Sequence, residues 1–151
     1  MFSYITWEIA VYRILILRVV NPMEQTKVYR WDQKHILVVE DDESSAYLLG
    51  RILHPTSARI SFITDGAEAV EFIREHPETD LVLMDIHLPG MDGFTATKEI
   101  KAISQKIIVI AQTSYSYSVE KREAVRAGCD AYFTKPIHPE LLLDKINGLL
   151  S

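Results

Sequence analysis

The chain has 151 residues, a length that suits a single domain with a hydrophobic core of its own. Apolar residues make up 48% of it and charged residues 25%, which is the composition of a soluble globular protein. The formal net charge is −5 and no Lys/Arg cluster occurs, so we expect no binding to nucleic acid, which normally needs a clustered basic surface.

Residues 1–20 are mostly apolar, but charges interrupt them. Glu8, Arg13 and Arg18 would each cost about 2.5–3.5 kcal/mol near the centre of a membrane helix. Neither the leading positive charge nor the small-residue cleavage site of a signal peptide occurs. We therefore expect a cytoplasmic protein without membrane insertion, whose amphipathic first segment packs on the domain or on a partner. Met23 leaves a further interpretation open, that the natural chain starts there.

Residues 22–34 are polar with isolated aromatic residues and are interpreted as a linker, which begins at the helix-breaking pair 21–22. From His35 onward, short apolar runs alternate with stretches of helical periodicity. We therefore divide the chain into an N-terminal extension, residues 1–34, and a domain, residues 35–151.

Five strands alternate with five helices along this domain. The strands are expected at residues 36–40, 59–63, 80–84, 107–111 and 130–134. The third helix is expected at residues 94–103. The other four helices are each expected to bury one apolar face. In chain order these faces are Leu48, Leu49, Ile52 and Leu53 for the first; Ala69, Val70 and Ile73 for the second; Ala124, Val125 and Ala127 for the fourth; and Leu142, Leu143, Ile146, Leu149 and Leu150 for the fifth. This alternation predicts an α/β fold, a parallel sheet with right-handed crossovers and helices on both faces.

Local signals add detail to this plan. Asp42 or Ser44 can cap the first helix, and Gly128 can end the fourth. The strand at 59–63 alternates polar and apolar residues, as expected at the edge of a sheet. The strand at 80–84 is apolar from residue 81 to residue 84 and is therefore expected to be buried on both faces.

Residues suited to chemistry follow the expected strands. Asp85 ends an apolar run and precedes a turn rich in glycine and proline, while Glu40 and Asp41 end the first strand. Thr113 follows the fourth strand and Lys135 follows the fifth. In an open parallel sheet, ligands bind beyond the carboxyl ends of the strands. The acids, the lysine and the threonine are therefore expected to meet in one crevice.

This constellation resembles the receiver domain of two-component response regulators, a family that accepts a phosphoryl group on aspartate. The resemblance covers the chain from about residue 35 to its end. It implies a flavodoxin-like, doubly wound five-stranded parallel sheet with the strand order 2-1-3-4-5, and a phosphoprotein that takes part in a phosphorelay. Residues 29–34 and 110–113 are similar to receivers appended to hybrid sensor kinases, and the chain stops after this domain. We therefore expect a detached, single-domain receiver.

The resemblance implies a role for each acid. Asp85 is then the phosphoacceptor and a ligand of Mg²⁺, Asp41 is a direct metal ligand, and Glu40 acts mainly through water. Mg²⁺ prefers such oxygen ligands. In this family the residue two positions beyond the acceptor contributes a backbone carbonyl to the metal, and here that residue is His87. Its imidazole is expected on the rim of the site rather than on the metal.

Three further residues complete the site that the resemblance implies. Thr113 hydrogen-bonds the phosphoryl group, and Lys135 pairs with the acids before phosphorylation and with a phosphate oxygen afterwards. The Lys135–Pro136 bond is cis in this family. Tyr132 stands at the position of the family's switch aromatic, although packing within a strand explains an aromatic residue there almost as well.

The family implies a sensor histidine kinase or a histidine phosphotransfer protein as phosphodonor, together with an output partner that the sequence does not name, or a second copy in a homodimer. It implies no enzyme beyond the domain's own phosphorylation and dephosphorylation. One rival is an aspartyl-phosphate-forming phosphatase of small molecules, but haloacid-dehalogenase-type enzymes use Asp-x-Asp, and residues 85–87 lack the second acid. A second rival, a nonreactive interaction module, is weakened because all the chemical groups are present.

Overall fold

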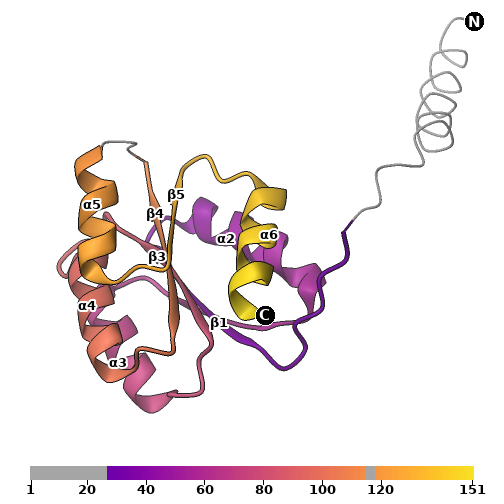
Figure 1. Ribbon diagram of the computed structural model, residues 1–151, viewed down its shortest axis with the longest axis horizontal. Helices are drawn as coiled ribbons and strands as arrows, with labels where there is room; N and C mark the ends of the chain where they lie inside the picture. The colour runs from indigo at the N-terminus through magenta and orange to yellow at the C-terminus, as the bar shows by residue number, and fades with distance from the viewer. Residues whose placement is uncertain (1–26, 115–117) are drawn as a thin grey trace, which may run out of the picture.

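The computed structural model describes residues 27–114 and 118–151, which form a five-stranded parallel sheet between two layers of helices (Figure 1). In chain order the elements are β1 (His35–Val39), α2 (Glu43–Leu53), the 3₁₀ turn η1 (His54–Thr56), β2 (Arg59–Ile63), α3 (Gly66–Glu75), β3 (Leu81–Asp85), α4 (Gly93–Ile103), β4 (Ile108–Thr113), α5 (Ser118–Ala127), β5 (Ala131–Thr134) and α6 (Pro139–Leu150). The strand order is β2-β1-β3-β4-β5. The predicted α/β fold and its strand order are confirmed.

The sheet separates two hydrophobic cores. Helices α2 and α6 cover one face, and α3, α4 and α5 cover the other (Figure 1). The inner strands β1 and β3 are buried along their whole length, which accounts for their apolar sequences between His35 and Val39 and between Leu81 and Met84; the polar residues stand at the strand ends. The edge strand β2 is only partly covered, in agreement with its alternating pattern.

Two residues expected in the core are on the surface. Leu48 is half exposed and Val125 is 72% exposed. Successive helical residues are about 100° apart around the axis. The buried stripe of α2 is Leu49, Ile52 and Leu53, and Leu48 lies about a quarter-turn to one side of it. Val125 lies still farther from the buried alanines of α5.

Strand β4 extends two residues farther at its carboxyl end than expected, and it begins one residue later. Polar residues at 112–113 look like the start of a loop, yet Gln112 pairs with Phe133 and Thr113 pairs with Thr134 of β5. Pairing with a neighbouring strand therefore decides the boundary, and it places Thr113 within the sheet at its carboxyl edge.

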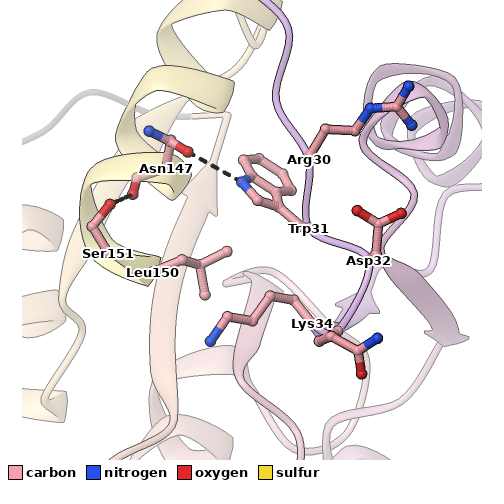
Figure 2. A pocket seen from close by; sticks show the side chains of 8 residues that line it. Arg30, Trp31, Asp32, Lys34, Asn147, Leu150 and Ser151 are labelled. Carbon is pink, nitrogen blue, oxygen red and sulfur yellow. Dashed lines mark hydrogen bonds between the residues drawn. The ribbon is translucent and has the colours of Figure 1, made fainter.

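The described part of the expected linker packs on the domain. We call residues 27–34 the strap. Trp31 of the strap is only 5% exposed and belongs to the core beneath α2 and α6. Its indole N–H donates to the Asn147 side-chain oxygen at 3.2 Å (Figure 2). Lys27 reaches the same helix through an ion pair of 2.8 Å with Asp144.

The amino-terminal edge of the sheet carries a buried histidine. The His35 ring lies 2.9 Å from Arg59 through Nδ1 and 2.9 Å from Ser61 Oγ through Nε2. Arg59 also donates to Glu78 at 2.7 Å. Because a guanidinium only donates, Nδ1 of His35 accepts and Nε2 carries the proton. Burial and the charge of Arg59 lower the pKa of His35.

Within residues 27–114 and 118–151, no helix is long and apolar enough to cross a membrane. The predictions for residues 1–22, including the alternative start at Met23, lie outside the described residues.

Candidate functional site

The polar residues predicted at the strand ends come together at the carboxyl edge of the sheet. Glu40 follows β1, Asp85 is the last residue of β3, and Lys135 follows β5. Parallel strands bring their carboxyl ends to one edge, which explains why residues 50 and 95 positions apart in sequence are in contact. The lysine Nζ lies 2.5 Å from Glu40 Oε2 and 3.3 Å from Asp85 Oδ2.

The two acids in this contact are buried, whereas the lysine side chain is 20% exposed. Burial raises the pKa of Glu40, against the opposing effects of its hydrogen bonds from Lys135 and from the Asp42 N–H. Burial alone would lower the pKa of Lys135, but Glu40 and Asp85 outweigh it and the net shift is upward. One lysine therefore stays charged beside two acids, and it does not fully offset the cost of ionising the buried Glu40.

A third acid adds to this negative charge. Glu40, Asp41 and Asp85 can each offer one carboxylate oxygen such that the three oxygens lie within 4.8 Å of one another. Among the described residues this is the one group of three or more acids, histidines and cysteines with that geometry. A set of three oxygens matches the ligand preference of Mg²⁺, which usually keeps several waters as well.

Asp42, the third residue of the acidic run 40–42, serves as a helix cap. Its carboxylate accepts from the Ser45 N–H at 2.7 Å and so caps α2. The hydrogen bond to the backbone lowers the pKa of Asp42. This agrees with the expectation that Asp42 caps the helix, and it leaves Glu40 and Asp41 as the pair next to Asp85.

The loop between β3 and α4 holds Asp85 against a glycine. A Cβ on Gly93 would lie 2.2 Å from the backbone oxygen of Asp85, so only glycine allows α4 to start this close. Asp92 caps α4 by accepting from the Phe94 N–H at 2.8 Å. Within the loop, the His87 N–H donates to Asp85 Oδ1 at 3.1 Å. The glycine contact and the His87 N–H therefore hold Asp85 in place through its backbone and its carboxylate.

A second group lies beside the acids, centred on Glu120 of α5. Its Oε2 accepts from the Thr113 hydroxyl at 2.8 Å and from the Tyr132 hydroxyl at 3.3 Å. The imidazole Nε2 of His87 lies 3.2 Å from Glu120 Oε1 and 3.2 Å from Thr113 Oγ1. Burial and the nearby Glu120 raise the pKa of Tyr132. Thr113, His87 and Tyr132, all predicted from the sequence, therefore meet around an acid that was not.

The structure also shows the peptide bond after Lys135 and the position of the His87 side chain, both of which were predicted. The Lys135–Pro136 peptide bond is cis. The His87 side chain is 46% exposed and points to Thr113 and Glu120, on the rim of the site. Glu120 escaped notice because nothing in a helical sequence reveals which strand end its first turn will face.

Comparison with known proteins identifies close relatives of this arrangement. The family model described as the response regulator receiver domain matches residues 36–147. The chemotaxis protein CheY of Halobacterium salinarum is 37% identical over 118 residues, which cover 78% of this chain and 98% of that protein. Other relatives are larger, and the chain spans only 7% to 26% of three of them.

Two solved structures show the same fold. The receiver domain of the sensor histidine kinase PA1611 from Pseudomonas aeruginosa, which has a magnesium ion in its active-site cleft, is 28% identical with a TM-score of 0.71 and covers 78% of this chain and 97% of its own. The receiver domain of a response regulator from Saccharomyces cerevisiae, in complex with a histidine phosphotransfer protein, is 28% identical with a TM-score of 0.73 and covers 80% of this chain and 90% of its own.

Proposed function

The chain belongs to the response regulator receiver domains, which are phosphoacceptor signalling domains, and we propose that Asp85 is the residue that accepts the phosphoryl group. The observation that carries this proposal is the contact of Asp85 with Lys135, next to two further acids at the carboxyl edge of the sheet. The phosphatase alternative is not favoured.

The proposed reaction is a single displacement at phosphorus. A bond forms between a carboxylate oxygen of Asp85 and phosphorus, while the P–N bond of a phosphohistidine donor breaks and its electron pair returns to the imidazole ring. Asp85 Oδ1 is oriented by the His87 N–H, and Oδ2 is paired with Lys135. In the product, Lys135 pairs with a phosphoryl oxygen and the Thr113 hydroxyl donates to another.

Receiver domains bind Mg²⁺ at an acidic site, and we propose that Asp41 and Asp85 hold the ion here, with Glu40 acting through water and His87 through its backbone carbonyl. When bound, the ion supplies the positive charge that lets a phosphate group approach carboxylates. The support from this chain is the three-oxygen group and the raised pKa of the buried Glu40. A cation would stabilise the ionised form of all three acids.

We further propose that the phosphodonor is a sensor histidine kinase or a histidine phosphotransfer protein in the cytoplasm. A related receiver is solved in complex with such a phosphotransfer protein. Helix α2, which begins directly beyond the acids, exposes the apolar side chains of Tyr47 and Leu48. The output goes to a separate protein or to a second copy of the chain. The domain acts as a catalyst only in its own phosphorylation and dephosphorylation.

The division of the chain is also part of this proposal. The receiver domain comprises residues 35–151, and residues 1–34 are an N-terminal extension whose last part, the strap, packs on α6. The support for the boundary is that β1 begins at His35, and the support for the packing of the strap is the buried Trp31 and the ion pair between Lys27 and Asp144.

Labelling with acetyl phosphate tests the proposed acceptor. With Mg²⁺ present, the wild type should take up one phosphoryl group per chain, whereas Asp85→Asn should take up none, because an amide is a very poor nucleophile. Asp92→Asn is the matched control: it lies on the same loop, asparagine caps a helix as well as aspartate does, and labelling should persist. Stoichiometric labelling of Asp85→Asn would refute the assignment.

A further inference from the structure

The geometry points to Glu120 as a positioning residue that holds the Thr113 hydroxyl away from phosphoryl binding, so that phosphorylation must first break the bond between these two side chains. This inference rests on the proposed function of Asp85 and adds a residue to it. The carboxylate of Glu120 lies on α5, seven positions beyond Thr113 in sequence, and its side chain is only 17% exposed.

A threonine hydroxyl has one proton to donate. In this structure Thr113 Oγ1 donates that proton to Glu120 Oε2 at 2.8 Å. A phosphoryl group on Asp85 also needs it, because phosphoryl oxygens at neutral pH accept hydrogen bonds. Glu120 and the phosphoryl group therefore compete for the same proton, and a bond to a charged acceptor is among the stronger hydrogen bonds in proteins.

His87 reinforces this arrangement. Glu120 can only accept, so the imidazole Nε2 that lies 3.2 Å from Glu120 Oε1 carries a proton and donates it. The same Nε2 lies 3.2 Å from Thr113 Oγ1, so its single N–H is shared between Glu120 Oε1 and the lone pairs that the hydroxyl keeps. His87 thus bridges Glu120 and Thr113, two residues after the acceptor itself, and the contact ties α5 to the loop that carries Asp85.

Glu120 also links the two predicted switch residues. Its Oε2 takes the hydroxyl protons of both Thr113, at 2.8 Å, and Tyr132, at 3.3 Å. When the phosphoryl group draws Thr113 away, this oxygen loses one of its two hydroxyl donors while a second negative charge is placed nearby. Both changes weaken the attachment of Glu120, and with it the first turn of α5, to the site. Tyr132, whose hydroxyl is bonded to the same oxygen, can then move together with this turn. The coupling from site to surface therefore runs through a carboxylate as well as through the threonine.

The binding of beryllofluoride, a phosphoryl mimic, in the presence of Mg²⁺ tests the inference. Glu120→Gln keeps the shape of the side chain but removes its charge, and it should bind the mimic about tenfold more tightly than the wild type, the equivalent of about one charge-assisted hydrogen bond. Glu123→Gln on the same helix is the matched control. Glu123 pairs with Arg126 at 2.6 Å and touches none of these groups, so affinity should not change.

A double-mutant cycle separates positioning from a general effect on α5. In a Thr113→Ala background the competing proton is gone, so Glu120→Gln should have little further effect on beryllofluoride affinity. The pKa of Tyr132, followed by NMR, should fall in Glu120→Gln, a change that loss of helix stability alone does not produce. An unchanged or weaker affinity in Glu120→Gln, or the same gain in both backgrounds, would overturn the inference. Failure of the wild type to bind the mimic at all would instead overturn the proposed role of Asp85, and this inference with it.

Discussion

The two edges of the sheet treat buried polar groups in opposite ways. At the amino-terminal edge, the His35 ring is bonded at both nitrogens, to Arg59 and to Ser61. At the carboxyl edge, two buried acids share Lys135, and the pKa of one of them, Glu40, is raised by burial.

A buried polar atom without a hydrogen bond also occurs at the carboxyl edge. Among the described residues, the one buried side-chain oxygen or nitrogen without a hydrogen bond is Oε1 of Gln112. Gln112 is the partner of Asp85 in the pairing of β3 with β4. An unpaired buried polar group costs stability, and this one lies at the same edge as the buried acids, which is the edge we infer to be shaped for a ligand. The other edge, together with the strap, serves stability.

The largest effect is expected where the strap enters the core. Trp31→Ala should lower the free energy of unfolding by about 3–5 kcal/mol, because it empties a buried site and removes the bond to Asn147. Chemical denaturation measures this. Trp31→Phe, which keeps most of the packing, should lose far less. Acetyl phosphate should still label the folded fraction of both variants, and loss of labelling at unchanged stability would break the division between the two edges.

Magnesium should have a smaller effect, and only at the carboxyl edge. At about 100 times its dissociation constant, Mg²⁺ should raise the free energy of unfolding by about 2.7 kcal/mol. The proposed ligand Asp41 is exposed, so Asp41→Asn should fold normally and lose most of this gain. Thermal melts with and without Mg²⁺, at matched ionic strength, give the comparison. An equal gain in the variant would remove Asp41 from the metal site.

The smallest effect concerns pH at the amino-terminal edge. Because the pKa of His35 is lowered below its usual 6.5 in the folded protein, its neutral form contributes stability above pH 6.5. That contribution is lost as pH falls from about 6.5 through the lower folded pKa, since the unfolded chain then binds a proton more readily. Stability should therefore fall between pH 7 and pH 5 in the wild type. The fall should be smaller in His35→Gln, and parallel pH profiles would contradict the assignment.

The same division explains what could be predicted from the sequence. The alternation of strands and helices fixes which chain ends share an edge, so the contact of Asp85 with Lys135 followed from local patterns. Trp31 carries no such signal, because a lone aromatic in a polar segment does not show that α6 will cover it. Glu120 was missed for a similar reason: its partners depend on where α5 lies against β4, which is a property of tertiary packing.

We infer that the charge imbalance at the carboxyl edge serves phosphorylation of one particular aspartate. The most direct test is to locate the phosphoryl group. After incubation with acetyl phosphate and Mg²⁺, borohydride reduces an aspartyl phosphate to homoserine, and peptide mass spectrometry finds the altered residue. Conversion confined to Asp85 is the result we predict. Conversion at Asp41 or Glu40, or at an acid outside this edge, would contradict the account.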